Sequence, residues 1–247
     1  MIHRTTLGMI AATTAGLVIT NNPAHALTMD FDHDAQGNII KRGQFIDEEY
    51  ADWGVHIQAK NYARPFDAAI TFDSLNPTGG DTDLRTDSKR YGLNNDRERG
   101  MVLILAENIK DKNKDGYVDK PDDEGDRPAG YFDFLFDYRV NAGGLVMLDI
   151  DNRCEPGSVQ FFLDGSLLSQ SFNFAALGDN SIQTLDWSGF EYDKMRINLG
   201  GSGAVAEVTA NPIPEPVTVV LVAGAVAAVG MRASGRRRHK DSDDVIA

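Results

Sequence analysis

Hydrophobic and polar residues alternate in short runs along most of the chain. Such runs occupy residues 55–59, 68–72, 132–138, 144–150, 158–163, 181–187, 194–199 and 204–208. A period of two puts the apolar side chains on one face of an extended strand. Since Gly, Asn, Asp and Pro separate the runs, the pattern predicts a mostly β fold with a single β-sandwich or jelly-roll-like domain.

Two segments depart from this alternation. Residues 101–106, with the sequence MVLILA, are apolar throughout and predict a strand that is buried on both faces. Residues 44–53 predict one or two helical turns that end at Gly54, because glycine readily takes the left-handed conformation after a helix.

Turns and loops account for the polar stretches. Asp164-Gly165 and Gly178-Asp179-Asn180 separate strand-like runs and predict two hairpin turns. Residues 76–100 and 108–130 predict loops that are long for a compact domain. Loops of that length are often functional or disordered.

The N-terminus carries the features of a secretory leader. Arg4 precedes an apolar stretch at residues 7–19, and Ala24-His25-Ala26 has the small-x-small pattern that signal peptidase cleaves. Residues 1–26 are therefore predicted to be a signal peptide, with Leu27 as the first residue after cleavage. A buried N-terminal helix is the alternative interpretation.

The C-terminus combines a helix-resisting tripeptide, an apolar run and a basic cluster. Pro214-Glu215-Pro216 is followed by the apolar residues 217–231 and then by Arg232, Arg236, Arg237, Arg238, His239 and Lys240. A helix over 217–231 rises only about 22 Å, against a hydrocarbon core of about 30 Å, so it would span a membrane marginally. The basic cluster marks the side that stays in the cytoplasm.

This tail resembles the PEP-CTERM sorting signal. The resemblance covers residues 212–240 and implies recognition and cleavage by an exosortase-type processing enzyme, with transient membrane attachment beforehand. The extension 241–247 departs from tails that stop near the arginines. An ordinary anchor that is never cut is the alternative. Residues 27–211 remain as the exported β-sandwich domain, sent to the cell surface or an extracellular matrix.

Composition restricts the classes of ligand that suit the exported domain. The formal net charge of the chain is −13, which disfavours nucleic acid and anionic membrane surfaces and suits divalent cations or solubility alone. Cys154 is the only cysteine, so an internal disulfide is impossible.

One loop has the spacing of a calcium site. Oxygen-bearing side chains fall at positions 1, 3, 5, 9 and 12 of a twelve-residue segment, Gly116 stands at position 6, and a backbone carbonyl serves at position 7. The resulting ligands are Asp111, Asn113, Asp115, the carbonyl of Tyr117, Asp119 and Asp122. The segment resembles the loops of EF-hands and dockerins, although Asp122 replaces the usual Glu, and the resemblance implies calcium as the cofactor. A solvated acidic loop is the alternative.

Three Asp-x-Asp pairs place two carboxylates on one face of an extended chain. They are Asp30 with Asp32, Asp81 with Asp83, and Asp149 with Asp151. Each pair has the geometry of a second calcium site or a carboxylate catalyst, but such pairs are common in an acidic chain, so a solvated edge is the favoured interpretation.

Signals for catalysis are sparse. His33 and His56 have no metal-ligand spacing, and the chain contains no Gly-x-Ser-x-Gly nucleophile motif. Trp53, Tyr62, Tyr91 and Trp187 are candidates for sugar-stacking platforms or for core positions. The sequence thus predicts a non-enzymatic, calcium-stabilised protein with a structural, adhesive or polysaccharide-binding role. A secreted carbohydrate-active hydrolase that uses an Asp/Glu pair is the alternative.

Overall fold

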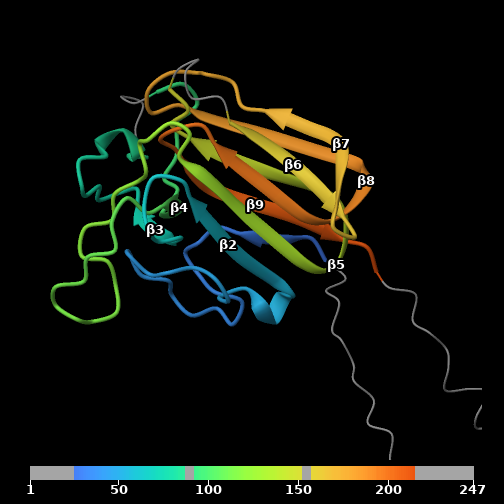
Figure 1. The fold of residues 1–247 in the computed structure, drawn as a ribbon, viewed down its shortest axis with the longest axis horizontal. Helices are drawn as coiled ribbons and strands as arrows, with labels where there is room; N and C mark the ends of the chain where they lie inside the picture. The colour runs from blue at the N-terminus through green and yellow to red at the C-terminus, as the bar shows by residue number, and fades with distance from the viewer. Residues whose placement is uncertain (1–24, 87–91, 152–156, 215–247) are drawn as a thin grey trace, which may run out of the picture. The chain divides into compact units, whose positions relative to one another are not determined.

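The structure, a computed structural model, describes residues 25–86, 92–151 and 157–214, and these residues form nine antiparallel strands (Figure 1). Two 3-10 turns, η1 (Ala51–Trp53) and η2 (Thr82–Leu84), lie between them. The strands are β1 (Leu27–Met29), β2 (Val55–Asn61), β3 (Ala69–Asp73), β4 (Met101–Leu105), β5 (Gly130–Leu148), β6 (Ser158–Leu163), β7 (Ser166–Asn173), β8 (Ile182–Leu199) and β9 (Ala204–Pro212).

A long ribbon of β5 and β8 joins the two layers of a β-sandwich. The two strands pair from Gly130 opposite Leu199 to Leu148 opposite Ile182, and their register shifts between Leu135 and Ala142. The first half of β5 pairs with β2, and the matching part of β8 pairs with β6, which carries β7 at the edge. The second half of β5 pairs with β9, which is followed by β4 and β3 and also holds β1. The predicted β-sandwich class is therefore correct.

The main core lies between the two layers. Phe132 and Phe134 from the first half of β5 belong to the same buried cluster as Leu145 and Met147 from its second half. At the bend of the ribbon, Trp187 Nε1 donates a hydrogen bond to Tyr192 Oη at 3.0 Å. Trp187 is thus a core residue, as one of the two sequence interpretations had it.

A second, smaller core covers the other side of the β3–β4–β9 layer. Val102 and Ile104 belong to it, while Leu103 and Leu105 point into the main core, so β4 is buried on both faces as predicted. Leu84 and Val118, from the two long loops, also pack into this second cluster. These loops are therefore anchored to the sheet by apolar side chains, and Figure 1 shows them gathered beside β3 and β4.

Residues 44–46 run beside β3, residues 47–50 form bends and turns, and only the 3-10 turn η1 matches the predicted helix. The backbone N–H of Ile46 donates to Ala69 O, and the N–H of Thr71 donates to Gln44 O. Pairing with β3 therefore uses the backbone groups that a helix would need. Gly54 ends η1 in the left-handed conformation, as expected.

The two predicted hairpin turns differ in outcome. Asp164 and Gly165 link β6 to β7 with positive φ at both residues, as a tight hairpin requires. Residues 178–180 also turn, but β7 and β8 lie on opposite sides of β6 and do not pair. That second turn is a crossover connection, so its prediction as a hairpin was wrong.

The compact unit of the fold extends to Ile213. Among the described residues, no helix has the length and apolar character needed to cross a membrane. The predicted apolar helix at 217–231, the basic cluster and most of the predicted leader lie outside the described residues.

Candidate metal centre

Seven aspartates converge where several loops meet at one end of the sandwich. They come from the β3–β4 loop, the β4–β5 loop, the segment after β5 and the β7–β8 connection, and we call them the acidic end: Asp81, Asp83, Asp122, Asp123, Asp149, Asp151 and Asp179. Two groups of three offer carboxylate oxygens that lie within 4.8 Å of one another. One group is Asp81, Asp122 and Asp123, and the other is Asp149, Asp151 and Asp179.

Asp123 is the buried member of the first group. It is 6% exposed, and its Oδ2 accepts hydrogen bonds from Ser202 Oγ at 2.7 Å and from the backbone N–H of Gly203 at 2.8 Å. Its own backbone N–H donates to Asp81 Oδ2 at 3.0 Å. Asp123 thus ties the β8–β9 turn to the two long loops, through its carboxylate on one side and its backbone N–H on the other.

Asp149 is the buried member of the second group. Its exposed fraction is 0%, and its Oδ1 accepts a hydrogen bond of 2.6 Å from the backbone N–H of Asn180. Ser202 Oγ lies 3.5 Å from Asp149 Oδ2 while it also donates to Asp123. Ser202 therefore connects the two groups.

Burial and mutual repulsion raise the pKa of these carboxyl groups. Burial and then the charge of Asp123 raise the pKa of Asp81 to about 9, and burial raises that of Asp149 to about 8. The pKa of Asp123 is raised as well, by burial, but the hydrogen bonds from Gly203 and Ser202 favour its charged form. In the pair, the proton therefore resides on Asp81 when no cation is bound.

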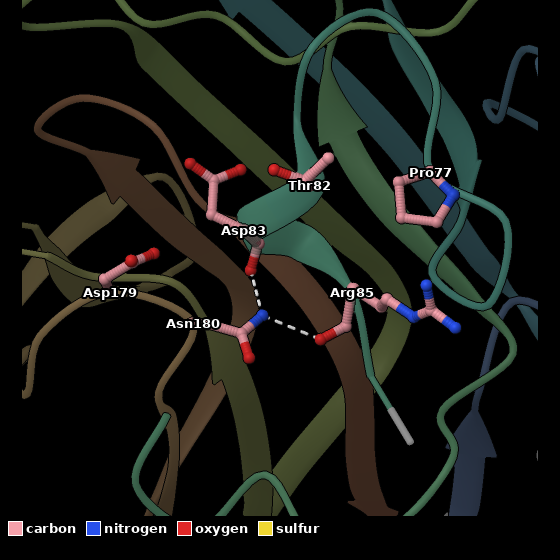
Figure 2. Close-up of a pocket in the computed structure, with 6 residues that line it drawn as sticks. All are labelled: Pro77, Thr82, Asp83, Arg85, Asp179 and Asn180. Atoms are coloured by element: carbon pink, nitrogen blue, oxygen red, sulfur yellow. Dashed lines mark hydrogen bonds between the residues drawn. The ribbon is translucent and has the colours of Figure 1, made fainter. Parts of the chain in front are cut away.

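A pocket opens beside the second group. Pro77, Thr82, Asp83, Arg85, Asp179 and Asn180 line it (Figure 2). The side chain of Asn180 donates to the backbone carbonyls of Asp83 and Arg85, which fixes η2 against the turn before β8. Asp83 and Asp179 are close enough for the charge of Asp179 to raise the pKa of Asp83 further, after burial.

The chemistry of this end suits a hard divalent cation. Calcium takes six to eight oxygen ligands from carboxylates, carbonyls and hydroxyls, in flexible geometry. Each group supplies three carboxylates, and Ser202 adds a hydroxyl between them. The acidic groups can therefore hold a metal ion.

The predicted calcium loop is folded around its first aspartate. Asp111 accepts hydrogen bonds from the backbone N–H groups of Lys114 and Gly116, at 2.6 and 2.9 Å. Asn113 Nδ2 donates to Asp115 Oδ2 at 2.9 Å. The loop therefore curls so that Asp111, Asn113 and Asp115 stay connected.

The last three predicted ligands have different surroundings. Asp119 Oδ2 accepts a bond of 2.8 Å from the N–H of Lys112, which closes the loop. The ring of Tyr117 lies 4.9 Å below Lys41 Nζ, so this side chain contacts the N-terminal segment. Asp122 joins Asp81 and Asp123 in the first carboxylate group. Calcium binding by the full predicted set stays a prediction.

The other predicted residues divide between the domain and the undescribed termini. Leu27 begins β1 and Ala26 precedes it, while Pro214 is the last described residue. Ala24, Glu215, Pro216, Arg236, Arg237 and Arg238 lie outside the described residues. The predicted cleavage and sorting motifs therefore stay predictions.

Of the three Asp-x-Asp pairs, two contribute to the acidic end and one does not. In the pair of Asp30 and Asp32, Asp32 Oδ1 accepts a hydrogen bond of 2.8 Å from the N–H of Met101 and orients the start of β4. Asp123 and Asp179 were not among the predicted ligands. Asp123 directly follows the predicted loop and Asp179 lies in a predicted turn, so neither had a spacing signal.

Comparisons with known proteins yield only remote similarities. No family profile matches the chain, and no curated protein matches it. A fucose-binding module of Streptococcus pneumoniae is 16% identical with a TM-score of 0.29, over 37% of this chain and 71% of that module. Discoidin II of Dictyostelium discoideum is 10% identical with a TM-score of 0.30, over 44% of this chain and 49% of that protein. Similarities this low assign no family.

Proposed function

We propose that this protein is an exported, non-enzymatic β-sandwich that binds calcium and has a structural or adhesive role through polysaccharide binding at the cell surface or in an extracellular matrix. The calcium part is carried by one observation, the convergence of two groups of three carboxylates around the buried Asp123 and Asp149. Buried like charges repel one another, and a bound divalent cation offsets that repulsion.

Calcium would stabilise the fold because the carboxylates come from separate loops. Asp81 and Asp123 are 42 residues apart in sequence, and Asp149 and Asn180 are 31 residues apart. An ion that binds the folded state and not the unfolded chain raises the free energy of unfolding. Once the ion concentration exceeds Kd, this gain grows with the logarithm of the ratio of the concentration to Kd. The ion would also fix the loops of the acidic end relative to the sheet.

Thermal unfolding with calcium, with magnesium and with chelator tests this proposal. Calcium should raise the Tm of the exported domain, and chelator should lower it. The double variant Asp123→Asn/Asp149→Asn should lose most of that difference, whereas Asp30→Asn, an exposed aspartate outside both groups, should keep it. Identical melting curves with calcium and with chelator would refute calcium binding.

The export and sorting part rests on the sequence of the two ends. We propose cleavage after Ala26 and exosortase-type processing near Pro214-Glu215-Pro216. Mass spectrometry of the mature protein tests both cuts. An exported protein that still ends in Val245-Ile246-Ala247 would contradict processing and favour a retained anchor.

A carbohydrate-active hydrolase is the competing function. It predicts release of reducing sugars from polysaccharides and loss of that activity on substitution of an Asp/Glu pair. Binding without turnover across a panel of glycans would support the proposed function instead.

A further inference from the structure

Three lysines line one hollow beside the first carboxylate group. The hollow has a volume of about 410 Å³ and is formed by the β3–β4 loop together with the loop between β4 and β5. Its lining comprises Gly79, Asn108, Lys110, Lys112, Asp119, Lys120 and Asp122. Pockets for small molecules have volumes of about 300–1,000 Å³, so this hollow has room for a small ligand.

Hydrogen bonds between the two arms of the β4–β5 loop fix the backbone that carries these lysines. The N–H of Asp119 donates to Lys110 O at 3.0 Å, and the N–H of Lys112 donates to Asp119 Oδ2 at 2.8 Å. Asn108 Nδ2 donates to Lys120 O at 3.2 Å. The three lysines therefore stand on one preformed frame, and a ligand that binds them does not have to order the loop first.

The β3–β4 loop closes the other side of the hollow. Gly79 has a φ of +76°, and a Cβ added there would lie 2.6 Å from Asp122 Cγ. Thr78 Oγ1 donates to Pro121 O at 3.0 Å. Because Gly79 has no side chain, its backbone lies close against Asp122, which also belongs to the first carboxylate group. The hollow therefore adjoins the candidate cation site.

The balance of charge in this hollow differs from that of the whole chain. Its lining has three lysines against two aspartates, although the net charge of the chain is −13. Three other hollows in the described part of the chain have more acidic than basic side chains in their linings. The ammonium of Lys60 lies 3.0 Å from Asp67, whereas no described carboxylate forms an ion pair with the three lysines of the hollow. Ammonium groups without a partner attract oxyanions.

Calcium would remove the opposing charge of the two aspartates. Asp119 and Asp122 are both predicted ligands of the calcium loop, and Asp122 also belongs to the first carboxylate group. A divalent cation bound to these carboxylates offsets their negative charge. The three lysines are then in excess, so the hollow favours an oxyanion more strongly after calcium binds than before.

We propose that this hollow binds an oxyanionic group such as sulfate, and that calcium and the oxyanion strengthen each other's binding. The inference rests on the calcium binding proposed above and adds a second ligand to the same end of the domain. A free ion and an acidic group carried by a polysaccharide both present this chemistry.

Calorimetry at constant ionic strength tests the inference, with sodium sulfate, dextran sulfate and uncharged dextran as probes. Each probe is added to the calcium-loaded domain and to the domain freed of calcium by a chelating resin. Sulfate should bind more tightly with calcium, and calcium should bind more tightly with sulfate by the same factor. Dextran should not bind to the hollow.

Charge variants of one loop locate the site. Lys112→Gln and Lys120→Gln should each reduce the affinity for sulfate about tenfold, which is the loss expected for one charge-assisted contact. Lys114→Gln is the matched control, because it removes the same charge from the same loop outside the lining, and it should leave the affinity within about twofold. Circular dichroism confirms that each variant is folded, and an unchanged effect of calcium on Tm confirms that each still binds the cation.

The outcomes separate this inference from the proposed function. Stabilisation by calcium without binding of sulfate or dextran sulfate would overturn the oxyanion site and leave calcium binding intact. No effect of calcium on Tm or on sulfate binding would refute calcium binding itself. Sulfate affinity that is equal with and without calcium would overturn the coupling, and an equal loss in Lys114→Gln and Lys112→Gln would mean non-specific attraction and overturn the site. Tighter binding of dextran sulfate per sulfate group would support the site and identify the polysaccharide as the source, and equal binding would support it for the free ion.

Discussion

The hydroxyl of Ser202 donates to the carboxylate of Asp123 at 2.7 Å, across 79 residues of sequence. Ser202 follows β8, Asp123 follows the predicted calcium loop, and the backbone N–H of Gly203 donates to the same carboxylate oxygen. A carboxylate this buried would destabilise the fold without such donors or a cation. This contact therefore links the end of the predicted loop to the turn between β8 and β9.

Separate substitutions should distinguish the predicted loop from the carboxylate groups. Asp115→Ala removes a ligand of the loop only, and Asp149→Asn removes one from the second group only. If calcium occupies both regions, each variant should lose part of the stabilisation by calcium, and the two losses should add in the double variant, because distant sites are independent. Calcium titration followed by Tm measures this.

A single variant that abolishes the whole calcium effect would assign the stabilising ion to one region. Asp52→Ala, an exposed aspartate of η1, is the matched control and should respond to calcium like the unsubstituted domain.

The stability of the metal-free domain should fall as the pH rises. The folded pKa values of Asp81 and Asp149, about 9 and about 8, exceed the ordinary value of 3.8, so the folded state holds more protons than the unfolded chain between these limits. The stabilisation that comes from protonating these two carboxyl groups is therefore complete below pH 4, and it is lost as the pH rises through 8 to 9. The pKa of His56, raised by its hydrogen bond to Glu48, contributes with the same sign.

Chemical denaturation with chelator at pH 5, 7 and 9 checks this slope. Calcium should flatten it, because the ion favours the deprotonated carboxylates. The double variant Asp81→Asn/Asp149→Asn should be less sensitive to pH in chelator. Metal-free stability that rises from pH 5 to pH 9 would contradict the burial of these groups.

Much of the fold was predictable because strand alternation is a local property of the chain. The boundaries of the strands were less predictable. The alternation predicted two strands, at residues 132–138 and 144–150, but both belong to one strand, β5, which has a register shift inside it. Gly143 and Gly144 stand where the two runs meet, and glycines at such a place are typical of a turn. In the structure they instead permit the close approach of neighbouring strands within the bent β5.

The metal centre was predictable only in part, for a related reason. Asp81-x-Asp83 and Asp149-x-Asp151 were visible as pairs, but Asp81 is grouped with Asp122 and Asp123 instead of with Asp83. Which carboxylates meet is decided by how the long loops pack on the second core, and this depends on apolar contacts such as those of Leu84 and Val118. Spacing along the chain carries no information about that packing.

Removing the ring of Phe161 should destabilise the domain strongly. Phe161 is fully buried and meets Trp187, Phe190 and Tyr192 at centroid distances of 4.9 to 5.0 Å. Phe161→Ala should cost about 3–5 kcal/mol through the lost burial and the remaining cavity. Leu167→Ala, whose side chain is 57% exposed on β7, should change the free energy of unfolding by less than about 0.5 kcal/mol.

Urea denaturation of both variants measures the two values. A cost below about 1 kcal/mol for Phe161→Ala would contradict the aromatic cluster at the bend of the ribbon.

Gly43 should be essential for the docking of the predicted calcium loop. Its φ is +77°, and a Cβ added there would lie against the backbone carbonyl of Val118, whose N–H donates to Gly43 O at 2.8 Å. Gly37 has a similar φ of +82° and open space around the added Cβ. Both Gly→Ala substitutions incur the strain of a left-handed residue, roughly 1–2 kcal/mol, so their difference isolates the contact with Val118.

Gly43→Ala should therefore lower the Tm more than Gly37→Ala and should expose residues 107–124 to proteolysis, because Val118 would be displaced from the second core. Its Tm should also respond less to calcium if the loop must be docked to bind the ion. Equal Tm values and equal cleavage patterns in the two variants would show that the loop folds without this contact.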